Sequence, residues 1–217
     1  MWVREEVQEV PWSNVVSWTL TQGCVVVGQS VLRRDIERTY VRLGGGRGRR
    51  WIGCLRAPGV QAVIVLRFGQ WLLRRHRLVR IVLDPVYHVL NLAVQIVWGI
   101  EVPRHAKIGP GFYIGHFGGI TISAEAVVGS NCNISQGVTI GVAGAHEKRG
   151  VPVIGDDVYI APGARVFGGI SIGNNVKIGA NAVVHQDIPD NAIAVLDPGF
   201  RVISYKGNRR RAPRATL

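Results

Sequence analysis

The hydrophobic pattern in the second half of the chain repeats every six residues. An aliphatic residue recurs at this interval: Ile154, Ile160, Val166, Ile172, Ile178 and Val184. A second apolar residue follows each of these after four positions: Val158, Ala164, Ile170, Val176, Ala182 and Ile188. This period does not fit a helix of 3.6 residues per turn, whereas a short strand followed by a corner repeats at this length. Three such units form one triangular coil, so the pattern predicts a mainly β fold, a β-helix with aliphatic ladders inside.

The same frame extends upstream, with two interruptions. Its inward positions are Val102, Ile108, Ile114, Ile122, Val128, Ile134 and Ile140. The interval from Ile114 to Ile122 is two residues longer than the period of six. A longer excursion separates Ile140 from Ile154. Because solenoids carry function in such loops, we expect the chemistry there. Cys132 falls on an inward position, which predicts a small buried core residue rather than a redox group.

Residues 31–98 have the pattern of helices rather than strands. A first helix is predicted over Val31–Leu43, ending at three successive glycines. A mixed apolar and basic stretch follows over Gln61–Arg80, and Asp84-Pro85 is expected to break it before a last apolar helix, Val86–Trp98. We therefore divide the chain into an extension (1–30), a helical region (31–100), the β-helix domain (101–205) and a basic tail (206–217).

The charge is uneven and narrows the choice of partners. The formal net charge is +12, and residues 30–107 alone contribute +11. A basic block beside apolar residues fits an acidic partner, nucleic acid or a membrane surface. Nucleic acid is disfavoured because no aromatic stripe, zinc pattern or helix-turn-helix signal accompanies the charge. The apolar run Val86–Ile100 holds three polar residues and is short for a membrane span, which leaves peripheral contact of the basic helices with a membrane.

The compartment follows from the cysteines and the N-terminus. Three widely spaced cysteines with no CxxC pair are typical of a reducing environment. The first residues carry acidic side chains where a secretion signal needs a basic and then an apolar stretch. We expect a cytoplasmic protein, with peripheral contact at the inner membrane face left open.

Residues 55–205 resemble the serine acetyltransferase group of the hexapeptide-repeat acyltransferases. The matching segments are Leu66–Leu72 (LRFGQWL), Ile108–Gly111 (IGPG), Gly115–Ile120 (GHFGGI), Ser135–Gly141 (SQGVTIG) and Ile178–Val184 (IGANAVV). The resemblance implies a left-handed β-helix and a homotrimer with active sites in the clefts between neighbouring prisms. It also implies acetyl-CoA as co-substrate, a small-molecule hydroxyl acceptor and no metal.

The resemblance also assigns candidate site residues. His116 matches the catalytic histidine, and Glu101 matches the acidic residue fifteen positions earlier that orients it. Histidine suits this role, because a hydroxyl nucleophile needs a base poised near neutral pH. Ala161 and Ala180 match positions on the coils that line the CoA channel. Gly141 of the SQGVTIG segment, and Lys148 and Arg149 of the long excursion, are further candidates for acetyl-CoA binding.

The chain departs from the family pattern on the acceptor side. Gly115 stands where the family has an aspartate before the histidine, and Val151 stands where it has a second histidine. Both missing groups hold the amino acid acceptor in the family. No acidic residue lies between Gly44 and Arg80 to bind an ammonium group. Two acceptors therefore stay open, L-serine and a sugar or polysaccharide precursor.

Three alternatives remain beside this hypothesis. A β-helix that serves only as a scaffold or interaction protein is the main one. A zinc site is disfavoured, because His105 and His116 have no third ligand in an obvious register. His146, in the long excursion, either replaces the lost histidine, binds CoA phosphates or is solvated.

Overall fold

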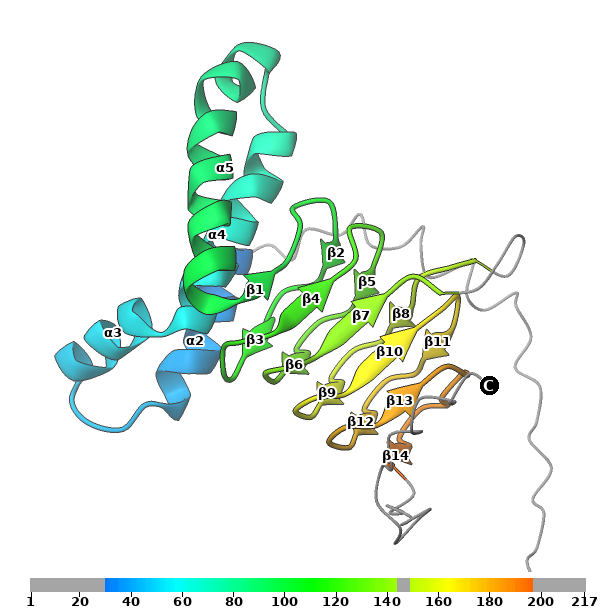
Figure 1. Ribbon diagram of the computed structural model, residues 1–217. Coiled ribbons are helices and arrows are strands. Elements are labelled where there is room, and N and C mark those ends of the chain that lie inside the picture. The colour runs from blue at the N-terminus through cyan, green and yellow to red at the C-terminus, as the bar shows by residue number, and fades with distance from the viewer. Residues whose placement is uncertain (1–29, 144–148, 197–217) are drawn as a thin grey trace, which may run out of the picture.

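The computed structural model describes residues 30–143 and 149–196, and Figure 1 shows its arrangement. The predicted extension, the basic tail and the loop residues His146 and Lys148 lie outside the described residues. From Ile100 onward the chain winds through short parallel strands, three to a coil. Their bounds are β1 (Ile100–Glu101), β2 (Lys107–Ile108), β3 (Tyr113–Ile114), β4 (Ile120–Ile122), β5 (Val127–Val128), β6 (Asn133–Ile134), β7 (Thr139–Gly141), β8 (Val153–Ile154), β9 (Tyr159–Ile160), β10 (Arg165–Phe167), β11 (Ser171–Ile172), β12 (Lys177–Ile178), β13 (Val183–Val184) and β14 (Ile193–Ala194).

The strands form the three faces of a prism. The first sheet has the order β1-β4-β7-β10-β13, the second β11-β8-β5-β2, and the third β14-β12-β9-β6-β3. All pairings are parallel, and a regular coil returns after 18 residues, as where Thr121 pairs with Thr139. The predicted parallel β-helix is confirmed.

The predicted ladders form the core of the prism. The inward aliphatic residues from Ile100 to Val184 are all less than a tenth exposed, and Cys132 is fully buried among them. Ile170 is the exception among the second apolar positions, being only partly buried against the core. Outward residues of the same strands are half-buried or exposed, so each two-residue strand alternates once between solvent and core.

Both interruptions of the six-residue period appear in the register. Ile100 pairs with Ile120 across the first, and Thr139 pairs with Arg165 across the second. The inserted residues project from the coil at its corners, and the strand pairing is unchanged. The second excursion is closed at its base by an antiparallel bridge between Ala143 and Gly150.

Among the described residues, four helices precede the prism. They are α2 (Val31–Arg42), α3 (Arg47–Arg56), α4 (Pro58–Leu73) and α5 (Arg77–Trp98). Helices α2, α4 and α5 contact the first coil of the prism. Helix α4 packs on β3 and on α5, and α5 leads into β1 through Gly99, whose left-handed backbone (φ 60°) ends the helix. Gly59 of α4 lies so close to the Ile114 carbonyl that a Cβ there would collide with it, which fixes a glycine at this crossing.

The expected break at Asp84-Pro85 is wrong. Helix α5 continues through Pro85, and the chain turns instead at residues 74–76. Proline removes only one hydrogen bond to a carbonyl four residues earlier, and Pro85 lies on the exposed side of the helix, where that carbonyl can meet water. The resulting 22-residue helix, unlike the shorter run considered from sequence, is long and apolar enough to cross a membrane by length and composition.

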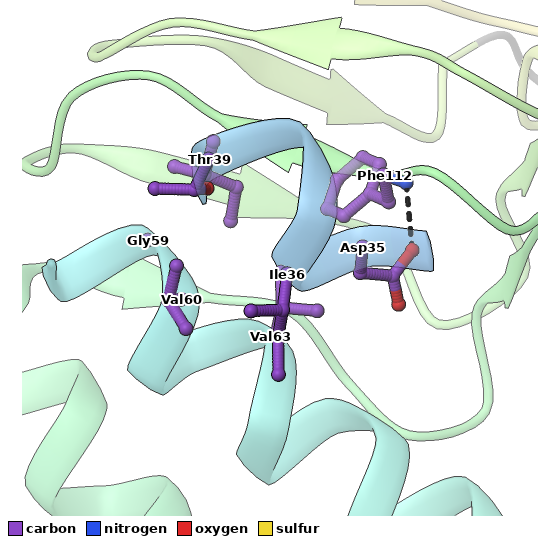
Figure 2. Close-up of a pocket in the computed structure, with 8 residues that line it drawn as sticks. Asp35, Ile36, Thr39, Gly59, Val60, Val63 and Phe112 are labelled. Carbon is purple, nitrogen blue, oxygen red and sulfur yellow. Dashed lines mark hydrogen bonds between the residues drawn. The ribbon is translucent and has the colours of Figure 1, made fainter. Parts of the chain in front are cut away.

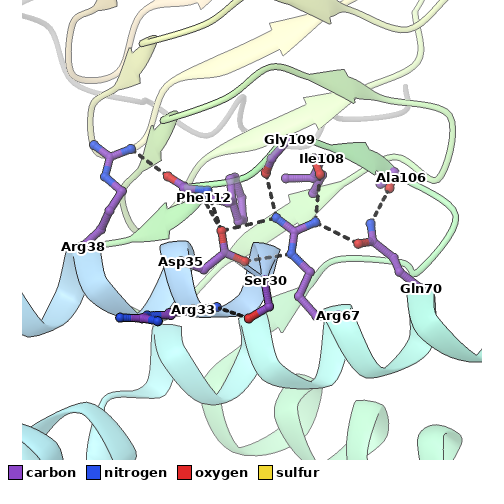
Figure 3. Close-up of polar contacts among 11 residues, drawn as sticks. Ser30, Arg33, Asp35, Arg38, Arg67, Gln70, Ala106, Ile108, Gly109 and Phe112 are labelled. Carbon is purple, nitrogen blue, oxygen red and sulfur yellow. Dashed lines mark hydrogen bonds and ion pairs between the residues drawn. The ribbon is translucent and has the colours of Figure 1, made fainter. Parts of the chain in front are cut away.

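A buried ion pair joins the helices to the β-helix (Figure 3). Asp35 accepts hydrogen bonds from the backbone N–H groups of Gly111 (2.7 Å) and Phe112 (2.9 Å), and from Arg67 Nε (2.8 Å). Arg67 also donates to the carbonyl oxygens of Ile108 and Gly109. Beside this cluster, Figure 2 shows residues of α2 and α4 around Phe112, packed so closely that no space for a water molecule remains between them. The cluster fastens α2 and α4 to the corner before β3.

Candidate functional site

His116 lies in the first interruption, at the corner between β3 and β4. Its side chain and that of Phe117 are exposed, and the next two residues, Gly118 and Gly119, have positive φ (101° and 65°). A Cβ on Gly118 would meet nothing within 4 Å, so the backbone here is open on that side. The N–H groups of residues 116–119 donate to no acceptor among the described residues. The corner thus presents an imidazole next to several available backbone donors.

The corner that carries His116 continues along one edge of the prism. Gly115 N–H donates to the Ile134 carbonyl, Ser135 N–H to Ile160, and Ala161 N–H to Ile178. The candidate residues His116, Ala161 and Ala180 therefore lie on this one edge. His116 and Ala180 are three coils apart, about 14 Å at the usual strand spacing. An elongated ligand laid along this edge would reach all three.

Glu101 lies on the edge strand of the first sheet, β1. It is the last residue of β1, is exposed, and pairs in register with Thr121 of β4. Among the described residues no hydrogen bond or ion pair joins it to His116.

The second interruption holds two further candidates. Gly141 ends β7, with its Cα facing the Phe167 ring, and Gly168 N–H donates to its carbonyl. Arg149 is exposed at the base of the excursion, and Lys148 beside it is outside the described residues. These residues lie at the corner after β7, away from the edge that carries His116.

Two features at the His116 corner escaped the sequence reasoning. The Trp98 ring at the end of α5 meets Phe117 edge-on at 5.3 Å, which places the last helical turn against this corner. Gln136 occupies the register position next to His116 on the following coil, and its side-chain oxygen is buried without a hydrogen-bond partner. Its place in the SQGVTIG segment could be seen in the sequence, but a buried acceptor without a partner becomes apparent only in the structure.

Other titratable groups of the described residues show no second reactive centre. No group of three His, Cys, Asp or Glu residues that would suit a metal ion occurs in the described ranges. Burial raises the pKa of the Cys132 thiol to about 11, and its Sγ contacts the Gly155 carbonyl oxygen at 3.2 Å. A thiol so protonated is a poor nucleophile near neutral pH, which fits the core role predicted for it.

Comparison with known proteins places this geometry in a family. The bacterial transferase hexapeptide model (six repeats) matches residues 152–186. A serine acetyltransferase of Synechococcus elongatus is 36% identical over 152 residues, covering 70% of this chain and 59% of that protein. A serine acetyltransferase of Helicobacter pylori is 34% identical over 164 residues, covering 76% of this chain and 92% of its own length. The chain therefore spans almost all of one relative and less than two thirds of the other.

Solved structures agree with these relatives. The Neisseria gonorrhoeae serine acetyltransferase in complex with serine superposes with a TM-score of 0.62 at 28% identity, covering 75% of this chain and 64% of that one. A serine acetyltransferase in complex with CoA has a TM-score of 0.62 at 26% identity, covering 77% and 66%. The fold is the left-handed parallel β-helix that the resemblance implied. The chain belongs to the serine acetyltransferase family of hexapeptide-repeat acyltransferases.

Proposed function

We propose that this protein transfers the acetyl group of acetyl-CoA to the hydroxyl of a small acceptor, with L-serine as that acceptor. The observation that carries the proposal is the match over 92% of the Helicobacter pylori serine acetyltransferase. The exposed imidazole of His116 at an open corner, on the edge that also holds Ala161 and Ala180, supports it from the structure.

In the proposed reaction His116 acts as a general base. Its free ring nitrogen accepts the proton of the acceptor hydroxyl while the hydroxyl oxygen bonds to the thioester carbonyl carbon. The carbon–sulfur bond then breaks, and the imidazolium returns the proton to the CoA thiolate. The unpaired N–H groups of residues 116–119 are suited to stabilise the negative charge on the carbonyl oxygen during this step.

We assign acetyl-CoA to the edge of the prism that begins at His116. Ala161 and Ala180 leave room for the pantetheine arm, since both side chains are small and Ala180 is exposed. Gly141 and Arg149 lie at the corner after β7, and we propose that Arg149 and its neighbour in the sequence, Lys148, bind the CoA phosphates. Because Gly141 and Arg149 are away from the His116 edge in one chain, their part in the same site requires a neighbouring copy.

A homotrimer supplies that neighbour in this proposal. In a cleft between two prisms, the His116 edge of one copy would face the β7 corner of the next. The exposure of His116, Phe117 and Glu101 in a single chain fits a site that association completes. A particle of three times the mass of the chain, measured by light scattering after size exclusion, would support this arrangement.

The acceptor is the finer part of the proposal. The relatives and structures named above are serine acetyltransferases, which supports L-serine over the sugar or polysaccharide precursor that the departures at Gly115 and Val151 suggested. Gln136 is a candidate for holding the serine, because its buried side-chain oxygen lacks a donor beside His116. Glu101 remains our candidate for orienting the imidazole once the neighbouring copy is in place.

The test measures CoA release from acetyl-CoA with L-serine. We expect His116→Asn to lower kcat/KM by about 10²–10⁴-fold, the usual contribution of a positioned general base. His105→Asn is the matched control, since His105 is also exposed at a coil corner. Turnover that survives His116→Asn would contradict the role of His116 as the base. No turnover with L-serine, while acetyl-CoA still binds, would contradict L-serine as the acceptor. Absence of acetyl-CoA binding would favour the scaffold alternative.

A further inference from the structure

One long face of helix α5 is apolar and exposed. Its residues recur with helical spacing and lie between 42% and 74% exposed. They are Leu78, Ile81, Val82, Val86, Val89, Leu90, Leu92, Ile96 and Val97. Only Tyr87 and Val94 of this helix are buried. The face runs the length of α5, about 33 Å at 1.5 Å per residue.

An apolar face of this size marks an interaction, because soluble proteins seldom leave large contiguous apolar patches in water. Among the described residues, α5 packs on α4 and β1, contacts Arg104 through Asp84 and Tyr87, and meets the corner at Phe117 through Trp98. Figure 1 shows the α4–α5 pair projecting from the end of the β-helix that carries β1, with the turn between the helices at its far tip.

The tip of this pair is strongly basic. Arg74, Arg75 and Arg77 are exposed there, with Arg80 on the next turn. Asp84 is the one acidic residue in the sequence of α4 and α5, and its carboxylate pairs with Arg104 at 2.5 Å and stands 4.0 Å from Arg80. The hydrogen bond from Arg104 also holds the pKa of Asp84 below its ordinary value, so this carboxylate stays ionised and engaged. The arginines of residues 74–77 have no hydrogen-bonded carboxylate among the described residues.

An aromatic side chain completes the tip. The Trp71 ring is 41% exposed, and the Arg75 guanidinium stacks over it at 4.5 Å. Tryptophan and arginine at the border of an aliphatic face are characteristic of helices that lie at a membrane–water interface.

We propose that the α4–α5 pair docks this protein on an anionic phospholipid surface. The aliphatic face of α5 enters the boundary between headgroups and acyl chains, and Arg74, Arg75 and Arg77 bind lipid phosphates, with Trp71 at headgroup level. Helix α4 is held against β3 and α5 continues directly into β1, so the pair lies on the surface rather than passing through it.

The charge favours lipid over a second copy as the occupant. Copies related by a rotation axis along α5 would bring the three arginines of each tip close together, and the described residues of the tip offer no free carboxylate against them. Anionic headgroups supply that counter-charge, with a favourable contribution from each arginine near the surface.

Flotation of the full-length protein with phospholipid vesicles tests the proposal. We expect binding to vesicles of phosphatidylcholine mixed with phosphatidylglycerol, and much weaker binding to phosphatidylcholine alone. Replacing all three arginines in R74Q/R75Q/R77Q should weaken binding about a hundred-fold. The matched control K107Q/R165Q/K177Q removes the same charge from exposed positions on the three sheets and should retain at least a tenth of the binding.

A second variant, L78Q/V82Q/V89Q, tests the apolar face without touching the charge. It should fold, because the three side chains are at least 67% exposed, and it should lose vesicle binding at unchanged circular dichroism. Equal loss in the β-helix control would overturn the proposal, since binding would then reflect net charge alone. Absence of vesicle binding would also overturn the proposal. So would an α5 variant that changes the oligomeric mass or the unfolding midpoint, because either change would show that a protein surface covers the face.

Discussion

The β-helix and helix α5 use similar aliphatic residues in opposite ways. Within the prism the aliphatic residues at the first inward position of each six-residue unit are at most 8% exposed, whereas nine aliphatic residues of α5 are between 42% and 74% exposed. Each coil buries its inward residues between the two coils next to it, so the prism completes its own core as it winds. A helix on the outside of a solenoid has no such neighbour on its far side, and its apolar face needs a partner from elsewhere.

Helices α2 and α4, which precede α5, are fastened to the β-helix by the polar Asp35–Arg67 cluster. The pair is almost fully buried, with side chains 1% and 9% exposed. It also binds backbone groups at residues 108–112 on the corners of the first coil. Such a junction fixes the position of the helices through directional hydrogen bonds. Apolar contacts alone would specify that position less tightly.

Breaking this junction should give the largest effect on stability. Asp35→Ala leaves the Arg67 guanidinium buried without its counter-charge and two backbone N–H groups without an acceptor. We expect the free energy of unfolding to fall by about 3–5 kcal/mol, as for other buried pairs that lose one partner. Urea denaturation measures it.

A control on the same helix separates this effect from a change in helix charge. Glu37 is exposed two residues away, and Glu37→Ala should change the free energy of unfolding by less than about 0.5 kcal/mol. The double variant Asp35→Ala/Arg67→Met should recover part of the loss, because no buried charge remains. Equal losses for Asp35→Ala and Glu37→Ala would mean that the pair does not join the two regions.

A matched pair of truncations tests the comparison directly. Ile160 is 0% exposed inside the prism and Ile96 is 74% exposed on α5, and each is changed to Ala. We expect Ile160→Ala to lower the free energy of unfolding by about 2–5 kcal/mol through lost burial and a cavity. Ile96→Ala should cost less than about 0.5 kcal/mol in the absence of lipid. A similar cost at both sites would show that the α5 face is already covered by protein.

The same contrast explains what could be predicted from the sequence. The inward positions, Cys132 included, and both interruptions followed from a period of six, because each coil contacts its neighbours at a fixed interval along the chain. The continuation of α5 through Pro85 did not follow, because it depends on which side of the helix the proline faces. The Asp35–Arg67 contact joins residues from separate helices, and no spacing in the sequence indicates it.

The candidate site divides in the same way. His116 could be located from the first interruption and the family motif, and the edge shared by His116, Ala161 and Ala180 follows from the coil length. The absence of a hydrogen bond between Glu101 and His116 in the described residues did not follow, since a spacing of fifteen residues does not determine where along a strand a side chain lies. The buried oxygen of Gln136 likewise depends on how two adjacent corners pack.

The smallest expected effect concerns the turns that let the prism wind so regularly. Five non-glycine residues of the described ranges have positive φ, all in turns before an inward apolar residue: Asn131, Asp157, Asn175, Asn181 and Asn191. Asn175 (φ 53°) also donates from its side chain to Asn191 at 2.9 Å. Asn175→Ala should lower the free energy of unfolding by about 1 kcal/mol, because alanine tolerates the left-handed region poorly. Asn175→Gly should cost less than half of that, since glycine adopts this conformation freely and loses only an exposed hydrogen bond. Urea denaturation of both variants distinguishes the causes: equal losses would assign the cost to the hydrogen bond, and a larger loss for alanine would assign it to the backbone conformation that the prism requires and helix α5 does not.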